Sequence, residues 1–409
     1  MKTLTGLIGV HWVKRASLLL IPAVFIIACS EDDPTTPYEP VYLDSFSIVN
    51  IFPKEEIQAM VISGGFLPPE VAAYVQYGVK ALRIYYHTTD VEGNSIIASG
   101  ALMVPVTDQA LPMLSFQHGT LASPNEAPSL FQSIYSDQLM FFSSTGFQAA
   151  LPDYIGYGVT SDLEHPYEHR ATLATATRDM LRASYEYFKV EGLKDPQDRL
   201  FLTGYSEGGF ATMAAIKLIQ EEHSDEFRIT AATVGAGAYN KTATAEYVIS
   251  SDEDQEYINT FLWVLDVYNR IYPVLQRPYG HYFNEPWATQ IEQYGVFSPV
   301  ELNPSLLFKS SFIESVLNGT DTHMLAVLAD NDCYNWKPEF PIRLYHGDAD
   351  RLVPYLNSSS AFLAMVAQGT QDIELITNEG GTHETSLEPY IMGSFNFFFS
   401  VQGKEAPFH

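Results

Sequence analysis

Two kinds of residue are scarce in this chain: cysteines and positively charged side chains. Only two cysteines, Cys29 and Cys333, occur among its 409 residues, and no cluster of possible ligands has the spacing of a metal site. Lysine and arginine number 22 against 49 acidic residues, which gives a formal net charge of −27. A surface of that sign repels phosphate backbones, so we expect no nucleic-acid partner.

Long apolar runs are scarce as well. The N-terminal run at residues 16–28 follows three basic residues and is too short to span a bilayer comfortably as a permanent helix. It ends in the letters IIAC, which resemble the lipobox of bacterial lipoproteins. The resemblance predicts a signal peptide over residues 1–28 and a lipid on Cys29. The alternative is an ordinary signal peptide that ends near a cysteine.

Residues 29–45 are acidic and rich in proline, which is typical of a solvated tether between an anchor and a folded body. An acidic run directly after the lipidated cysteine resembles the surface-export signal of Bacteroidetes-type lipoproteins. We therefore expect a protein anchored in the cell envelope, at the outer membrane, on its periplasmic or its external face. With Cys29 lipidated, Cys333 lacks a disulfide partner and is expected to be a small buried residue.

The remaining sequence alternates between strand-like and helix-like segments. This alternation predicts an α/β fold with a doubly wound, mostly parallel sheet. The predicted strands are 79–89, 95–105, 112–117, 146–152, 199–203, 228–235, 341–346 and 372–377, and the predicted helices are 54–63, 68–76, 129–144, 171–190, 206–222, 358–368 and 389–400. Between them, residues 240–338 carry helical runs without a clear strand. We thus expect a core of residues 46–239 and 339–409, with a helical insertion after the sixth strand.

The letters GYSEGG at 204–209 have the G-x-S-x-G form of a nucleophile elbow, between a predicted strand and a predicted helix. A serine hydroxyl needs an imidazole to take its proton and a carboxylate to orient that imidazole. His383 follows one late strand, and Asp348 and Asp350 both follow another. The chain order is then nucleophile, acid, base, with Ser206 as the nucleophile and either aspartate as the acid.

With these motifs the chain resembles the α/β-hydrolases, and within them the secretory lipase and esterase group. GYSEGG, HGDADRLVP at 346–354 and GGTH at 380–383 carry the resemblance. It implies the α/β-hydrolase fold, Asp350 as the acid and Asp348 as a loop residue. It also implies an oxyanion hole made by the backbone N–H groups of Thr120, in the run SFQHGT, and Glu207.

The side chain of Glu207 needs a separate explanation because an ionised carboxylate beside the nucleophile would oppose the developing oxyanion. We expect this side chain to point away or to be paired, and Arg178 and Arg182 on the preceding helix are possible partners. The loop at 151–158 resembles the family's D-Y-x-G-x-G segment and is expected to be structural. Asp153 in that loop precedes the serine in the chain, which disfavours it as the acid.

The insertion at 240–338 is rich in aromatic residues, and in the resembling family such an insertion forms a cap over the serine. One helical face would carry Tyr257, Phe261, Val264, Leu265 and Tyr268. We expect this face to pack the cap against itself and the body. The alternative is an apolar or sugar-stacking pocket above the serine.

The sequence thus predicts a serine hydrolase that cleaves carboxylic esters through an acyl-enzyme and uses no metal or organic cofactor. Expected partners are a small-molecule, lipid or glycan ester and a membrane reached through the lipid anchor. Three alternatives remain: a serine peptidase, an acetyl or feruloyl esterase acting on polysaccharide, and a non-enzymatic binding lipoprotein. The complete set of catalytic residues argues against the last of these.

Overall fold

The computed structural model describes residues 38–64, 68–196 and 199–405. Within this part, the chain from Pro40 onward forms one compact unit. The predicted signal peptide at 1–28, the lipid site at Cys29 and most of the expected tether lie outside the described residues. No helix in the described ranges is both long and apolar enough to cross a bilayer.

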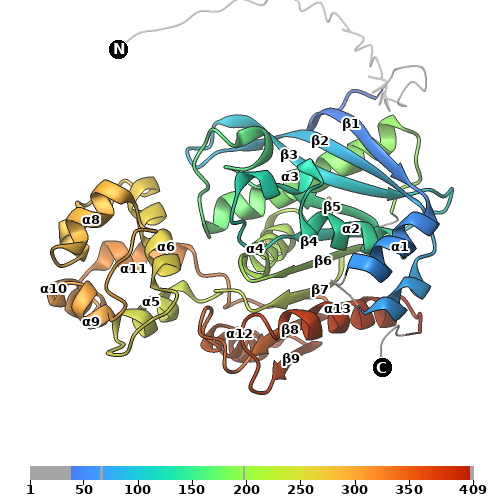
Figure 1. Ribbon diagram of the computed structural model, residues 1–409. Coiled ribbons are helices and arrows are strands. Elements are labelled where there is room, and N and C mark those ends of the chain that lie inside the picture. Colours follow the sequence, from blue (N-terminus) through green and yellow to red (C-terminus); the bar gives the residue numbers. More distant parts are fainter. Residues whose placement is uncertain (1–37, 65–67, 197–198, 406–409) are drawn as a thin grey trace, which may run out of the picture. The chain divides into compact units, whose positions relative to one another are not determined.

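A nine-stranded twisted sheet with the order β1-β2-β3-β5-β4-β6-β7-β8-β9 forms the centre of the described unit (Figure 1). The first three strands pair in antiparallel fashion, and β3 pairs with β5 in the same way. All later neighbours are parallel, from β5 to β9. The strands are β1 (Leu43–Phe52), β2 (Val79–Thr89), β3 (Ser95–Pro105), β4 (Met113–Gln117), β5 (Gln148–Pro152), β6 (Leu200–Tyr205), β7 (Ile229–Gly235), β8 (Ile342–Gly347) and β9 (Ile373–Asn378). The prediction of a doubly wound, mostly parallel sheet is confirmed.

Strand β1 was not predicted. It begins at Leu43, within the segment expected to be a tether, whereas the core was expected to begin at residue 46. Leu43 is its only buried residue because β1 lies at the edge of the sheet and pairs only with β2. An edge strand exposed on both faces has no alternation of apolar and polar residues to reveal it.

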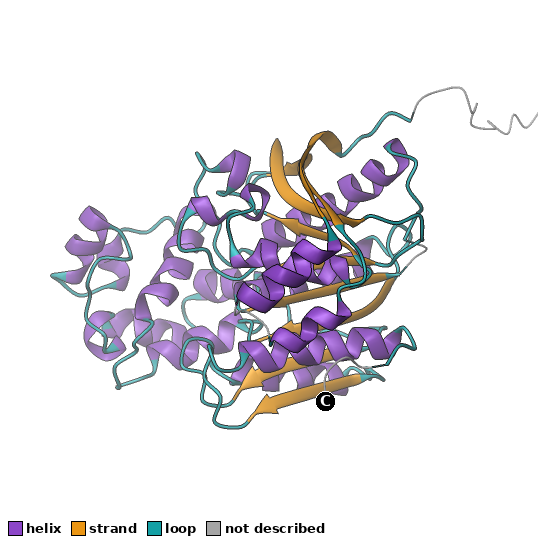
Figure 2. Cartoon of the chain, turned by 45° about the vertical axis from the view of Figure 1, so that its right-hand side comes forward, coloured by secondary structure: helices purple, strands orange, loops and turns teal. Residues whose placement is uncertain are grey.

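Helices cover both faces of the sheet (Figure 2). One apolar layer joins the sheet to α3 and α4, and a second joins its other face to α1, α2 and α13. The helices of the core are α1 (Lys54–Gly64), α2 (Ile134–Ser144), α3 (Arg170–Val190), α4 (Glu207–Glu222), α12 (Leu356–Ala367) and α13 (Leu387–Val401), with 3-10 turns at Pro69–Tyr74, Pro124–Glu126, Pro128–Leu130 and Gly158–Thr160. The predicted helix at 129–144 starts later than expected, after a separate 3-10 turn.

Seven helices follow β7 and form a cap with its own apolar core, drawn in yellow to orange in Figure 1. They are α5 (Lys241–Ile249), α6 (Ile258–Ile271), α7 (Tyr279–Tyr282), α8 (Trp287–Tyr294), α9 (Pro304–Leu307), α10 (Ser310–Leu317) and α11 (Thr322–Asp330). All of them lie inside the expected insertion at 240–338. The cap follows the sixth of the predicted strands, which is β7 once the unpredicted β1 is counted.

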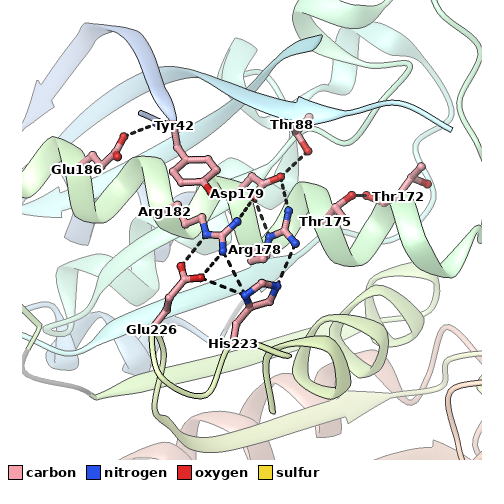
Figure 3. A network of polar contacts seen from close by, with 10 residues as sticks. All are labelled: Tyr42, Thr88, Thr172, Thr175, Arg178, Asp179, Arg182, Glu186, His223 and Glu226. Carbon is pink, nitrogen blue, oxygen red and sulfur yellow. Dashed lines mark hydrogen bonds and ion pairs between the residues drawn. The ribbon is translucent and has the colours of Figure 1, made fainter. Parts of the chain in front are cut away.

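A buried carboxylate ties α3 to the antiparallel end of the sheet (Figure 3). Asp179 is 2% exposed and accepts hydrogen bonds from Arg178, Arg182 and the hydroxyl of Thr88 on β2. The Arg182 guanidinium also lies 4.5 Å from the ring centroid of Tyr42. Because the two arginines are already paired with Asp179, they are not the partners of Glu207 that the sequence suggested.

Candidate active site

Ser206 lies at the sharp turn between β6 and α4. Its backbone has φ 61° and ψ −127°, a strained conformation for a residue with a Cβ. The flanking glycines make this turn possible because a Cβ on Gly204 would lie 2.2 Å from the carbonyl oxygen of Gly208. A Cβ on Gly208 would lie 2.1 Å from the carbonyl oxygen of Gln117. The hydroxyl of Ser206 is thereby held at the carboxyl end of the parallel strands, where open α/β sheets place their sites.

Two long-range hydrogen bonds join Ser206, His383 and Asp350 in a chain. The Oγ of Ser206 lies 2.9 Å from Nε2 of His383, and Nδ1 of His383 lies 2.6 Å from Oδ2 of Asp350. Ser206 and His383 are 177 positions apart in the chain, and Asp350 and His383 are 33 positions apart, so only the fold brings them together. The structure thus places the serine, the imidazole and the carboxylate in one line of hydrogen bonds.

Asp350 is fixed from both of its oxygens. Its Oδ1 accepts the backbone N–H groups of Leu352 at 2.9 Å and Val353 at 2.8 Å. Its Oδ2 faces His383 and also lies 3.3 Å from Nε2 of His346. Burial alone would raise the pKa of the Asp350 carboxyl, but its hydrogen bonds with the two histidines hold that pKa well below its ordinary value. Asp350 is therefore an ionised carboxylate at neutral pH.

The other aspartate of this loop has a local role. Oδ1 of Asp348 accepts the backbone N–H of Gly380 at 2.6 Å, which holds the loop that carries His383. His346, the first residue of the HGDADRLVP motif, contacts the hydroxyl of Ser358 at 2.7 Å and the carbonyl oxygen of Val353 at 2.8 Å. Neither residue contacts Ser206.

The loop after β4 passes directly beside the serine. A Cβ on Gly119 would lie 3.6 Å from the Cβ of Ser206 and 3.3 Å from the carbonyl oxygen of Tyr205. Thr120 follows Gly119, and its hydroxyl lies 3.0 Å from that of Tyr167. Glu207 is the first residue of α4, so its backbone N–H has no partner within the helix. Both expected oxyanion donors thus lie on segments adjacent to Ser206.

Glu207 is fully buried, and its side chain is paired as expected, but with His165. Oε1 of Glu207 lies 2.6 Å from Nε2 of His165, whose Nδ1 lies 2.7 Å from the carbonyl oxygen of Ile155. Oε2 of Glu207 has no hydrogen-bond partner among the described residues. The sequence gives no signal for this partner, because 42 positions separate His165 from Glu207 and no motif includes it.

A pocket lined mainly by apolar side chains extends from Ser206 into the cap. Helix α6 contributes Phe261, Val264, Leu265 and Tyr268 to its wall. Four of the five residues predicted to share a helical face therefore line the pocket, which is the alternative that the sequence analysis left open. The rest of the lining comes from the loop before α3, from α5, α10 and α11, and from the loop that carries Asp350; it includes Val248, Phe312, Val316, Met324, Leu328 and Val353.

One charged pair also lines this pocket. The carboxylate of Glu168 and the ammonium of Lys241 form an ion pair, and they are 6% and 3% exposed. Burial raises the pKa of Glu168, and the neighbouring Lys241 opposes that rise. The Lys241 ammonium also lies 4.0 Å from the ring centroid of Phe210. The pair joins the loop before α3 to the first helix of the cap.

The other residues weighed from the sequence have structural surroundings. The imidazole of His118, two residues before Thr120, contacts the carbonyl oxygens of Gly119 at 2.7 Å and Asp153 at 3.1 Å. The buried carboxylate of Asp153 accepts the hydroxyl of Ser99 at 2.5 Å, within the loop expected to be structural. Cys333 is 1% exposed and has no disulfide.

Comparison with known proteins agrees with this fold. A protein from Legionella pneumophila has 24% identity and a TM-score of 0.74, covering 90% of this chain and 100% of its own. The rice cell wall degrading esterase LipA from Xanthomonas oryzae has 22% identity and a TM-score of 0.73, covering 89% and 97%. These likenesses, together with the sheet order, establish the α/β-hydrolase fold.

The family assignment comes from the sequence itself. The secretory lipase family matches residues 133–388, and the chain belongs to this family. Lipase 5 of Candida albicans is 22% identical over 364 residues, which are 81% of this chain and 72% of that protein. The protein is accordingly a hydrolase acting on esters. A secretory family also indicates an exported protein, either extracellular or of the cell envelope.

Proposed function

We propose that the protein cleaves carboxylic esters by a serine mechanism with Ser206 as nucleophile, His383 as base and Asp350 as the orienting acid. The observation that supports this most directly is the pair of hydrogen bonds at 2.9 and 2.6 Å that joins the three side chains. A hydroxyl, an imidazole and an ionised carboxylate in this sequence of contacts can activate the serine oxygen.

In the first half of the reaction, Oγ of Ser206 attacks the ester carbonyl carbon while Nε2 of His383 takes its proton. The backbone N–H groups of Thr120 and Glu207 stabilise the oxyanion, each by about 3 kcal/mol in the transition state. His383 then gives its proton to the leaving alcohol, and an acyl-enzyme remains. Water activated by His383 attacks the acyl-enzyme and releases the acid. No step requires a metal or an organic cofactor.

The substitution Ser206→Ala tests this assignment. The purified protein is expected to hydrolyse p-nitrophenyl butyrate, and the variant is expected to lose this activity while its circular dichroism and melting temperature stay unchanged. The hydroxyl of Ser206 is the only group that the substitution removes, so a folded and fully active variant would refute the serine mechanism.

We infer from the pocket wall that the acyl part of the substrate is aliphatic and that the cap helix α6 covers it. Apolar side chains gain free energy by excluding water from an acyl chain, at about 0.8 kcal/mol for each buried methylene group. A panel of p-nitrophenyl esters with increasing acyl length, feruloyl esters, acetylated xylan and peptide amides separates this proposal from the peptidase and polysaccharide-esterase alternatives. Highest kcat/KM on a feruloyl ester, a polysaccharide or an amide would contradict the aliphatic assignment.

We further propose that Cys29 carries a lipid that anchors the protein at the outer membrane. The support is the lipobox-like end of the N-terminal run and the acidic segment that follows it. Metabolic labelling with an alkyne fatty acid should mark the wild-type protein and leave Cys29→Ser unmarked. Equal labelling of both proteins would contradict the anchor and leave the esterase assignment untouched.

A further inference from the structure

The buried side chain of Glu207 is a difficulty for the proposed reaction. It belongs to the residue directly after the nucleophile, on the helix whose first N–H group is the expected oxyanion donor. A negative charge here would repel the oxyanion that forms in the transition state, and the repulsion is strong in a buried site. The surroundings of this carboxylate therefore matter for the rate.

The hydrogen bonds around His165 determine how many protons the pair holds. Nδ1 of His165 faces the carbonyl oxygen of Ile155, which can only accept, so Nδ1 carries a proton. Nε2 lies 2.6 Å from a carboxylate oxygen of Glu207, and two lone pairs at that distance would repel each other. One more proton must lie between them. The pair then has zero net charge, whether that proton belongs to the imidazole or to the carboxyl.

The other titratable groups around Glu207 offer no alternative compensation. The tyrosines Tyr135, Tyr154, Tyr157 and Tyr167 surround it from α2, from the loop after β5 and from the loop before α3, and burial raises the pKa of each. Burial also lowers the pKa of His118, and its two ring nitrogens face the carbonyl oxygens of Gly119 and Asp153, so neither contacts the Glu207 carboxylate. The last two groups, Glu168 and Lys241, are paired with each other. His165 is thus the group that compensates Glu207.

We propose that His165 is a positioning residue for ester hydrolysis, which keeps the Glu207 side chain in a neutral, proton-bearing pair and so holds the Glu207 N–H ready for the oxyanion. This inference rests on the proposed serine mechanism. The 2.6 Å contact between Nε2 of His165 and Oε1 of Glu207 fixes the Glu207 side chain at the start of α4. The neutral pair also removes the repulsion that a free Glu207 carboxylate would exert on the oxyanion. The role concerns the transition state, so it should affect kcat more than KM.

The test uses His165→Gln, whose amide can donate a hydrogen bond to Glu207 but cannot supply the proton that neutralises the carboxylate, together with the double variant His165→Gln/Glu207→Gln. We expect His165→Gln to lower kcat at pH 8 by about tenfold or more, with KM changed by less than about twofold. We expect the double variant to recover most of this loss, because glutamine has the shape of glutamate without its charge.

His169→Gln is the matched control because His169 is also a buried histidine of the same segment, with its Nδ1 on the hydroxyl of Thr172. Its kcat should stay within about twofold of the wild type. Rates are normalised to the active sites titrated with a fluorophosphonate, so that misfolded protein does not count. His165→Asn provides a second unpaired Glu207 in case the glutamine variant does not fold.

Two results would overturn the proposal. One is a double variant as slow as His165→Gln, because a purely structural histidine predicts no recovery when the charge is removed. The other is an active His165→Gln with wild-type kcat. In both cases the wild-type esterase activity and its loss in Ser206→Ala would stand, so failure of this inference is distinct from failure of the proposed function.

Discussion

Replacing Asp350 by asparagine should reverse the tautomer of His383. Oδ1 of Asp350 accepts two backbone N–H groups at 2.8 and 2.9 Å, and an asparagine must place its own oxygen there. Its NH₂ group then takes the position of Oδ2, 2.6 Å from Nδ1 of His383. Because that group donates, Nδ1 must accept, and the imidazole proton moves to Nε2. His383 then points a donor at Ser206 and cannot take the serine proton.

The expected cost follows from the loss of the base. A triad with the wrong tautomer loses about 10³–10⁴-fold in kcat, which is about 4–5.5 kcal/mol of transition-state stabilisation. KM should change by less than about threefold, since the substrate pocket is untouched. Steady-state hydrolysis of p-nitrophenyl butyrate measures both constants. Asp348→Asn is the matched control, because that carboxylate lies two residues away and contacts only the backbone of Gly380.

The same substitution has a signature in stability. The pKa of Asp350 is lowered in the folded protein, so its carboxylate stabilises the fold at pH values above the unfolded pKa of about 3.9. This contribution is lost as the pH falls below 3.9 through the folded-state pKa. The difference in unfolding free energy between wild type and Asp350→Asn should therefore shrink at acid pH.

An Asp350→Asn variant within tenfold of the wild-type kcat, or an Asp348→Asn variant equally slow, would refute the tautomer argument.

Two further predictions concern the pocket and the core. Val264→Trp places a larger side chain in the pocket wall and should lower kcat/KM for p-nitrophenyl decanoate relative to the butyrate by about tenfold or more, whereas Val274→Trp on the exposed surface of the cap should not. Asp179→Asn removes a buried charge that two arginines share and should lower the free energy of unfolding in urea by about 2–4 kcal/mol without changing kcat. Glu221→Gln, in a surface pair with Lys217, should change the free energy of unfolding by less than about 0.5 kcal/mol. A smaller loss in Asp179→Asn than in Glu221→Gln would contradict this reading of the network.

The parts of the fold that sequence reasoning found are those with a strong local pattern. Strands β2 and β3 match their predicted residues. Most of β2 alternates between a buried and a less buried face, β3 is mostly apolar, and a short turn joins them. Strand β1 was missed because seven of its ten residues are exposed and they show no regular alternation. Its position depends on long-range contacts instead: Glu186 on α3 accepts the backbone N–H groups of Val41, Tyr42 and Leu43. Such contacts have no local signal.

In the candidate site, too, residues within local motifs could be predicted, whereas a long-range contact could not. Ser206, Asp350 and His383, which the structure joins by hydrogen bonds, could be predicted as a set because each lies in a short motif at a strand end. The partner of Glu207 was not found, and the arginines proposed for it are occupied by Asp179. Two arginines on the adjacent helix were a reasonable expectation from charge alone. The loop between β5 and α3 instead brings His165 into contact with α4, and a loop path of that length cannot be read from periodicity.

The loop between β5 and α3 contacts the nucleophile helix, the loop after β4 and the cap. His165 contacts Glu207 on the nucleophile helix, and the hydroxyl of Tyr167 lies 3.0 Å from that of Thr120 on the oxyanion loop. The ring of Tyr167 stacks on Trp263 of the cap at 3.9 Å, and the carbonyl oxygen of Glu168 accepts the hydroxyl of Tyr268. We therefore expect a shift of helix α6 to reach Thr120 and Glu207, the proposed oxyanion donors, through His165, Tyr167 and Glu168. The cap can then affect the rate of the chemical step as well as the choice of substrate.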